Sequence, residues 1–383
     1  MRLIEQHRQP SVGVTPPIST SAITYDQVIY ADPSFTHRRE GRIVPVRESD
    51  PRLTLYNGFP LVDSNNGLHL FARSESEQSE VAKVVKLDFT HRRTSGGSFL
   101  TPNGLVIDRA QDPSVSLVAP DRVAIGVVAI TNRRGKIAEY WPQLYEFEED
   151  GVSREKVATG PKSQKDIRVA YMGSYGGQDL SVIGARVRRV VGSRIDSYLQ
   201  LGVVPTAKDM GQLSQDIAEV KNDPSSRLDV LLPDGKTWFG PNQITPLQSQ
   251  SGDLAFGLLF HTGRWADRLY KNDELGRDYL ALVTEISADP DTMQVTGFTK
   301  PKVVATARNF PYIGAKRPDL GNVYFPGGFV FGIKNGLVER TVLVGGVRDS
   351  NIGWLDMSYP FSRPLNLELN RLSVLPVEKM PNF

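Results

Sequence analysis

The sequence predicts an all-β protein, a five-bladed β-propeller with a short N-terminal extension, and three observations carry this prediction. Short apolar runs such as LHLFA, VAIGVVAI, LAFGLLF and RTVLVGGV are separated by turns, in a chain with 34 Gly and 26 Pro. Helical periodicity is nearly absent. A unit made of a polar residue, an apolar strand, a turn and a second strand recurs five times.

Each repeat begins on Asn or Asp, at Asn57, Asp112, Asp166, Asn242 and Asp319. These positions lie 55, 54, 76 and 77 residues apart, close to the length of a propeller blade that carries some insertions. The first strand of each blade lines the central channel, so equivalent positions converge on one ring. The repeat therefore predicts three carboxylates and two amides around a central pocket.

The remaining segments fit around this repeat. Residues 1–45 are polar and Pro-rich and are assigned to the extension, which leaves residues 46–383 for the propeller. The best helical candidate is 210–221, MGQLSQDIAEVK, expected as an insertion between strand groups. The string FTHRR occurs at 35–39 and again at 89–93, which we interpret as chance or as paired surface strands.

Composition argues against several classes of function. The 45 basic and 43 acidic residues give a net charge of +2, which provides no field to hold nucleic acid or a membrane. The absence of Cys excludes disulfides, thiolate zinc sites and thiol nucleophiles, and it suits a reducing compartment. The N-terminal residues lack a signal-peptide core, and no apolar stretch approaches the ~20 residues that cross a bilayer. We expect a cytoplasmic protein. The sequence does not determine its oligomeric state.

The ring carboxylates have two interpretations. Asp at a strand start is often a turn former, but recurrence at one phase of the repeat favours a functional ring. We assign Asp112, Asp166 and Asp319 as the acid, base and orienting residues of a catalytic set, with the individual roles open. Cleavage of a glycosidic bond needs a carboxylic acid on one side of the sugar and a nucleophile on the other. Crowding should raise the pKa of one carboxyl enough to keep it protonated.

A second layer of residues is expected to bind the substrate. It consists of Asn57, Arg73, Glu75, Arg168, Arg186, Asn242, His261, Arg317 and Asp349. Its cations either pair with the ring carboxylates or offer donors to hydroxyls, carboxylates or phosphate. Arg168 lies two residues beyond Asp166, so both side chains should face the channel. Phosphate held by Arg168, Arg186 or His261 would be an alternative to water as the nucleophile.

Aromatic residues and metals leave two further questions open. Five aromatic side chains near strand ends either stack on a sugar or pack between blades: Tyr56, Trp238, Tyr312, Tyr324 and Trp354. We expect no cofactor and no catalytic zinc, because the five His lack the i, i+4 spacing of a helical zinc site. A structural calcium ion bound by channel carboxylates stays open.

Several segments taken together resemble a known family. In order, QDPSV, KDIRV, GPNQI with LLFHTG, and AKRPDLGNVYFPGG resemble an uncharacterised bacterial family of five-bladed propellers, catalogued as a domain of unknown function. The resemblance runs from about Leu53 to the C-terminus, and residues 315–328 are its most specific part. That family is distantly similar to five-bladed arabinan and fructan hydrolases and to the β-mannoside phosphorylases of glycoside hydrolase family 130.

The resemblance implies pocket positions for Asp112, Asp166 and Asp319, as in enzymes whose innermost strands carry the acidic residues. The chain departs from the arabinan hydrolases because no clear Glu acid lies on a matching strand, Glu75 being the nearest candidate. Three functions follow: a glycoside hydrolase or phosphorylase, a propeller that binds a sugar or sugar phosphate without turnover, and a scaffold for protein partners. An open central cavity would exclude the scaffold with a filled channel.

Overall fold

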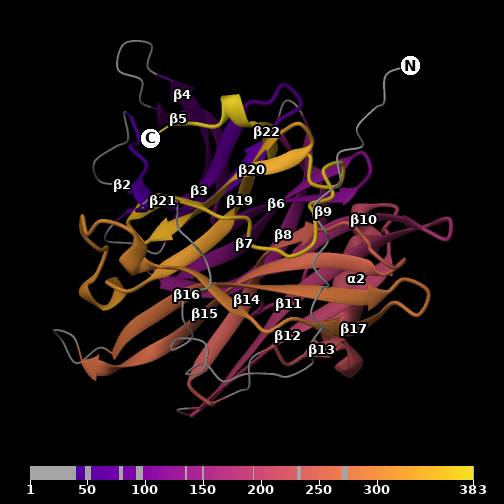
Figure 1. The fold of residues 1–383 in the computed structure, drawn as a ribbon. Coiled ribbons are helices and arrows are strands. Elements are labelled where there is room, and N and C mark those ends of the chain that lie inside the picture. The colour runs from indigo at the N-terminus through magenta and orange to yellow at the C-terminus, as the bar shows by residue number, and fades with distance from the viewer. Residues whose placement is uncertain are drawn as a thin grey trace, which may run out of the picture.

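The computed structural model describes residues 40–47, 53–76, 81–91, 98–133, 136–148, 151–192, 194–230, 234–269 and 275–382. Within these ranges the chain forms five largely antiparallel sheets arranged as the blades of a propeller (Figure 1). Each sheet is built mainly from strands that follow one another in sequence. The predicted five-bladed β-propeller is confirmed.

The first two blades are four-stranded meanders. Blade 1 contains β2 (Leu53–Val62), β3 (Leu68–Ser76), β4 (Ala82–His91) and β5 (Ser98–Asp108). Blade 2 contains β6 (Ala110–Ala119), β7 (Arg122–Arg133), β8 (Lys136–Glu148) and β9 (Gly151–Thr159). Of the two FTHRR strings, the first lies outside the described residues, and the described part of the second ends β4.

The next two blades carry the insertions. Blade 3 contains β10 (Arg168–Tyr175), β11 (Gln178–Val191), β12 (Arg194–Pro205) and the short β13 (Arg227–Leu228). The helix α2 (Met210–Asn222) and the 3₁₀ turn η1 (Pro224–Ser226) lie between β12 and β13. Blade 4 contains β14 (Thr237–Pro246), β15 (Leu254–Leu269), β16 (Leu275–Asp289) and β17 (Gln294–Phe298), and β18 (Lys302–Thr306) also pairs with β16.

Blade 5 combines strands from both ends of the chain. Its central strands are β19 (Tyr324–Lys334), β20 (Leu337–Val347) and β21 (Asn351–Met357), preceded by η2 (Ala307–Asn309) and η3 (Pro318–Leu320). β1 (Arg42–Ile43) pairs with β21, and β22 (Val374–Pro376), followed by η4 (Val377–Lys379), pairs in parallel with β19. Residues 42–43, assigned by sequence to the extension, therefore belong to this sheet.

Five clusters of buried apolar side chains lie between successive blades and hold the ring together. Leu70 and Val344 belong to the cluster between blades 1 and 5, and Phe71 and Ile125 to the one between blades 1 and 2. The innermost strands β6 and β14 are buried at every residue. Each blade thus uses both faces of its sheet, which is why its strands appear in the sequence as nearly continuous apolar runs.

The helix α2 forms where the sequence predicts it and covers the outer part of blades 2 and 3 (Figure 1). Its N-cap is Asp209, whose carboxylate accepts a hydrogen bond from the backbone N–H of Gln212 at 2.8 Å. Its buried residues are Met210, Leu213, Ile217 and Val220, which follow helical spacing. No helix in the described ranges has the length and apolar character needed to span a membrane.

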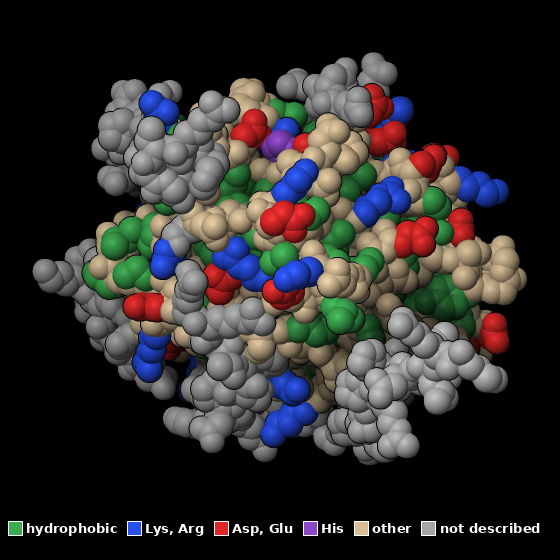
Figure 2. Space-filling model, turned by 45° about the horizontal axis from the view of Figure 1, so that its top comes forward, with side chains coloured by type: hydrophobic (Ala, Val, Ile, Leu, Met, Phe, Trp, Pro, Cys, Tyr) green, Lys and Arg blue, Asp and Glu red, His purple; other side chains and the backbone are tan. Residues whose placement is uncertain are grey.

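Charge is dispersed over one face of the molecule. On the face in Figure 2, Lys and Arg side chains lie among Asp and Glu side chains, and neither sign forms a continuous patch. This distribution agrees with the nearly balanced composition. It favours a partner recognised inside a pocket over a polyanion recognised by a broad surface.

Candidate active site

The repeated polar residues lie where the innermost strands depart from regular pairing. The register of β2, β6 and β14 skips at Asn57, Asp112 and Asn242 respectively, and Asp166 lies two residues before β10 begins. Asn57, Asp112 and Asp166 have φ values of 53°, 48° and 58°. Asn and Asp adopt this left-handed backbone more readily than other non-glycine residues, and a bulge re-aims the side chain. The local backbone thus explains why the repeat carries Asn or Asp.

The fifth blade differs from the expectation. Asp319 lies on η3, before β19, and therefore does not begin an innermost strand. In β19 the register skips between Pro326 and Gly328, so Gly327 takes the equivalent place. A Cβ added to Gly327 would lie 1.9 Å from the carbonyl oxygen of Gly58, which leaves no room for a side chain. The PGG motif at residues 326–328 is the sequence signal that marks Gly327 as the fifth repeat position.

A cavity of about 330 Å³ opens where three of the repeat positions, Asn57, Asp112 and Asp166, converge. Seven of the residues named from sequence line it: Asn57, Arg73, Asp112, Asp166, Arg186, His261 and Asp349. Sequence reasoning missed eight lining residues: Tyr140, Ser163, Lys165, Arg277, Tyr279, Leu320, Val323 and Phe325. The unfilled cavity does not fit a scaffold whose channel is packed with side chains.

Asp112 is the most extensively paired carboxylate of the cavity. It accepts a hydrogen bond from Asn57 Nδ2 at 2.9 Å, and its oxygens lie 3.3 Å from Arg73 Nη1 and 3.7 Å from Lys165 Nζ. Burial raises the pKa of Asp112, but Arg73, Lys165 and the Asn57 hydrogen bond outweigh it and bring the pKa to about 2. Asp112 is therefore ionised at neutral pH.

Asp166 forms a second charged group on the neighbouring blade. Its Oδ2 accepts a hydrogen bond from Arg186 Nη1 at 2.6 Å, and the carboxyl is almost fully buried. Burial raises the pKa of Asp166, but Arg186, His261 and Arg168 bring it below its ordinary value. The expectation that crowding keeps one of the ring carboxyls protonated does not hold for Asp112 or Asp166, because cations surround both.

Asp349 differs from the other two carboxyls of the cavity. It follows β20 with φ of 49°, in the left-handed region. Burial, and to a smaller extent Asp112, raise the pKa of Asp349, and the cations Arg73 and Arg277 offset this only in part. Asp349 is thus the cavity carboxyl best suited to carry a proton.

Glu75 lies behind Arg73 and does not line the cavity. It accepts hydrogen bonds from Arg73 Nε at 2.9 Å and Nη2 at 2.6 Å, and it pairs with Lys316. This bidentate contact fixes the direction in which the guanidinium of Arg73 reaches Asp112.

Asp319 does not line the cavity, but it contacts Arg277, which does. Its carboxylate lies 3.8 Å from Arg277 Nε and 3.2 Å from Arg317 Nε, and Arg317 is outside the cavity lining. The geometry makes Asp319 a partner that orients Arg277, and its catalytic role stays a prediction. Arg277 and Lys165 escaped sequence reasoning, although Lys165 directly precedes Asp166 in the repeat.

His261 is completely buried, and its ring lies between two aromatic rings at the cavity wall. Tyr279 stacks on it at 5.8 Å with an interplanar angle of 18°, and Phe325 lies 4.7 Å away. Burial lowers the pKa of His261 to about 3, since Arg186 and Arg168 add to the effect and the opposing influence of Asp166 is smaller. The imidazole is neutral at physiological pH.

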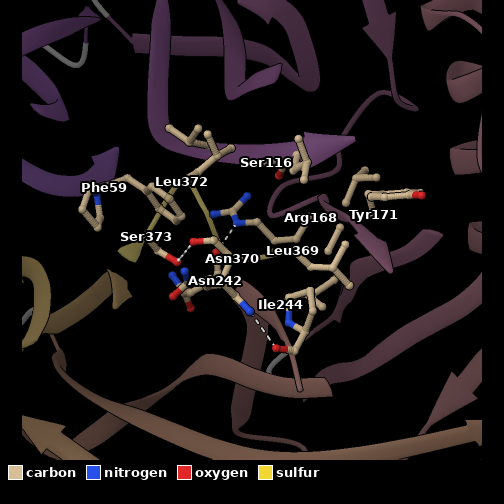
Figure 3. A pocket seen from close by; sticks show the side chains of 17 residues that line it. Phe59, Ser116, Arg168, Tyr171, Asn242, Ile244, Leu369, Asn370, Leu372 and Ser373 are labelled. Carbon is tan, nitrogen blue, oxygen red and sulfur yellow. Dashed lines mark hydrogen bonds between the residues drawn. The ribbon is translucent and has the colours of Figure 1, made fainter. Parts of the chain in front are cut away.

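Arg168 and Asn242 lie deeper in the channel. Arg168 donates from Nε to the carbonyl of Asn242 at 2.6 Å and from Nη1 to the carbonyl of Ile167 at 2.8 Å. Both residues line a pocket of only about 40 Å³ at the other end of the channel, shown in Figure 3. Arg168 and Asp166 therefore both belong to the channel wall but at different depths.

The aromatic candidates separate by burial. Four of them are packed inside the protein: Tyr56, Trp238, Tyr324 and Trp354. Tyr312 is 71% exposed and lies over Arg348, whose Cζ is 4.8 Å from the ring centroid. None of the five lines the cavity among the described residues. Tyr279, which sequence reasoning did not select, is the aromatic ring beside His261.

No cluster of three or more His, Cys, Asp or Glu side chains with the arrangement of a metal site occurs in the described ranges. The channel carboxylates instead contact Arg and Lys, as Asp112 and Asp166 show. Cations already occupy the positions that a calcium ion would need to take.

Residues 52–363 match the family described as Protein of unknown function (DUF1861). The chain belongs to this family. The match spans most of the propeller and includes every candidate residue discussed above. No curated protein matches.

Solved structures of several proteins share the fold of this DUF1861 protein. A mannose phosphorylase from Leishmania mexicana, in complex with phosphate ion, is 22% identical with a TM-score of 0.63, over 84% of this chain and 89% of that chain. A GDP-Man-dependent mannosyltransferase from the same organism is 23% identical with a TM-score of 0.61, over 84% and 90%. A hypothetical protein from Leishmania major is 20% identical with a TM-score of 0.59, over 88% and 95%.

Proposed function

We propose that the protein is a carbohydrate-active enzyme, a glycoside phosphorylase that cleaves a small mannoside with phosphate or forms it in the reverse direction. The observation that carries this proposal is the charge of the cavity. Arg73, Lys165, Arg186 and Arg277 line about 330 Å³ together with only three carboxylates, Asp112, Asp166 and Asp349. A surplus of forked donors in a buried site suits an anionic co-substrate.

The neighbouring carboxyls supply the proton that bond cleavage needs. In phosphorolysis a phosphate oxygen attacks the anomeric carbon, the glycosidic C–O bond breaks, and the leaving oxygen takes a proton. Asp349 is the proposed donor, since its pKa is raised by burial and by the ionised Asp112. Asp112 keeps the proton on Asp349 and is free to accept hydrogen bonds from the sugar.

The second charged group is the proposed phosphate site. Arg186 lines the cavity beside Asp166 and His261, and one of its guanidinium nitrogens, Nη1, donates to Asp166. A cavity of 330 Å³ is near the lower end of the ~300–1,000 Å³ typical of ligand sites. Its size supports a monosaccharide unit plus phosphate over a nucleotide sugar. The mannose phosphorylase with bound phosphate supports mannose as the sugar.

Two alternatives differ from the proposal in what they need from the site. A glycoside hydrolase would use water and would gain little from four cations. A binding protein would need only shape and hydrogen bonds and no proton donor, so the raised pKa of Asp349 favours an enzyme. A cytoplasmic location, with free phosphate at hand, is part of the proposal.

The test is a substrate screen with phosphate as the variable. Purified protein is incubated with β-linked mannose disaccharides and with nitrophenyl glycosides, each with and without inorganic phosphate, and sugar 1-phosphate is quantified. We also measure phosphate release from mannose 1-phosphate with sugar acceptors. The proposal expects turnover that requires phosphate.

Each other outcome selects a different function. Equal turnover without phosphate would identify a hydrolase. Binding of a mannoside by calorimetry with no turnover under any condition would identify a binding protein. Turnover with GDP-mannose but not with mannose 1-phosphate would identify a nucleotide-sugar transferase.

A further inference from the structure

One nitrogen of His261 is used by the fold and the other is not. Nδ1 lies 2.8 Å from Asn242 Oδ1. Nε2 is buried and has no hydrogen-bond partner among the described residues. A buried polar atom without a partner costs free energy, so a partner is expected to arrive with the ligand.

The chain also determines which nitrogen of His261 carries the proton. Asn242 donates from Nδ2 to the carbonyl oxygen of Pro326 at 2.5 Å, so its Oδ1 faces His261 and accepts the proton of Nδ1. A neutral imidazole with its proton on Nδ1 has a lone pair on Nε2. The aromatic rings of Tyr279 and Phe325 on either side keep the imidazole in this orientation. Nε2 is therefore a hydrogen-bond acceptor.

The acceptor lies within the proposed phosphate site. Asp166 Oδ2, another acceptor, lies 4.0 Å from Nε2, and Arg186 Nη1 donates to that same oxygen at 2.6 Å. An anion attracted by Arg186 thus meets two acceptors. Such an anion binds well only if it brings a proton of its own.

We propose that His261 Nε2 accepts the hydrogen bond of a protonated oxyanion, so that the cavity selects hydrogen phosphate over sulfate. The inference rests on the proposed phosphorylase function and adds the feature that determines anion specificity. Phosphate carries at least one proton at neutral pH, whereas sulfate of the same shape carries none. Sulfate has no proton to donate, so a lone pair of its oxygen would face the lone pair of Nε2. Sites built around a specific hydrogen bond reject analogues that lack the required donor.

The test compares three anions on the wild-type protein by calorimetry at neutral pH and constant ionic strength. Phosphate and arsenate, which both carry a proton, should bind with similar affinity. Sulfate should bind at least tenfold more weakly. Arsenate is the matched control, because it is larger than sulfate and would bind worse if size alone decided.

A variant then tests the part played by His261. In Asn242→Asp a carboxylate accepts from Nδ1 and stabilises the imidazolium, so Nε2 gains a proton and becomes a donor. The ratio of phosphate to sulfate affinity should fall toward one. The melting temperature reports whether the variant folds, and the wild-type comparison with arsenate decides the question if it does not.

The outcomes distinguish the anion-specificity inference from the proposed phosphorylase function. Equal affinity for phosphate and sulfate would overturn the inference and leave the phosphorylase proposal intact, since a sugar hydroxyl would then be the donor to Nε2. Binding of none of the three anions would overturn both. If the Asn242→Asp protein folds and its ratio of phosphate to sulfate affinity is unchanged, His261 does not determine which anion binds.

Discussion

The two ends of the propeller channel are built from the same strands and yet differ in almost every property. Asn57 on β2, Asp112 on β6 and Asp166 just before β10 line the 330 Å³ cavity, whereas residues further along these strands and residues of β14 line the 40 Å³ pocket. The cavity end carries four cations and three carboxylates. The other end is covered by residues 369–373, which lie between β21 and β22 of blade 5 (Figure 3).

The closed end is held by hydrogen bonds to backbone groups. Asn370 Nδ2 donates to the carbonyls of Pro246 and Asn366 at 2.7 Å, and the backbone N–H of Phe331 donates to the carbonyl of Ser373 at 2.8 Å. Arg371 also donates to the carbonyl of Pro120. We expect that the open end binds ligand and that the closed end contributes stability, and three experiments test this difference.

The largest effect is expected at the open end. Asp349→Asn removes the proposed proton donor and Asp112→Asn removes the charge that keeps the proton on it, while both retain the side-chain shape. Loss of acid–base function typically lowers turnover ~10²- to 10⁴-fold. Initial rates of phosphorolysis measure the effect, and Asp121→Asn in an exposed turn is the control with wild-type rate. The two defects should be far from additive in the double variant, because residues acting on one reaction behave as a unit.

Activity that survives both substitutions would contradict a catalytic role for the carboxyls at the open end. Full loss of activity with a melting temperature lowered by many degrees would do the same, since the carboxylates would then be structural. Retained binding of the sugar by calorimetry completes the expected result.

A smaller effect, on stability alone, is expected at the closed end. Asn370→Ala leaves the carbonyls of Pro246 and Asn366 without their donor, which costs about 1–3 kcal/mol in the free energy of unfolding. Denaturant titration measures the loss, and Glu368→Ala at an exposed position of the same segment is the matched control. The rate per folded molecule should equal that of the wild type. A changed KM in Asn370→Ala would show that the closed end takes part in ligand binding.

The smallest effect concerns acid stability. The pKa of Asp112 is about 2 in the folded protein and near 3.8 in its ordinary state. Its folded pKa is depressed, so its contribution of about 2 kcal/mol is present above the unfolded pKa and is lost as pH falls toward 2. Thermal melts of wild type and Asp112→Asn should therefore converge between about pH 5 and pH 2. Parallel curves over this range would show that Asp112 is not ion-paired.

Sequence reasoning predicted the architecture and seven of the fifteen residues that line the cavity, for an identifiable physical reason. Asn57, Asp112 and Asp166 have left-handed backbone conformations, where few residue types are tolerated, so the backbone imposed a repeat that the sequence displays. At the fifth position a close approach of Gly58 requires glycine, and the repeat disappeared there. Asp319 was chosen in its place, eight residues too early.

Other cavity contacts depend on how strands of different blades are placed, and a local sequence pattern does not predict that placement. Arg277 reaches the cavity from β16, and Tyr279 follows it on the same face of that strand. Arg168 lines the deeper pocket and Asp166 lines the cavity, because two residues of extended chain advance about 7 Å along the channel. That difference separates the two ends.

The fifth blade has a consequence for how the chain folds. Blades 1 to 4 are meanders whose strands are neighbours in sequence, but β1 pairs Arg42 with Trp354, and Ile43 with Gly353, across most of the chain. Nearly the whole polypeptide must leave the ribosome before this pair can form, so the contacts that close the ring have the highest sequence separation and form slowly. Until then the apolar faces around Leu70 and Val344 stay open to water and to chaperones.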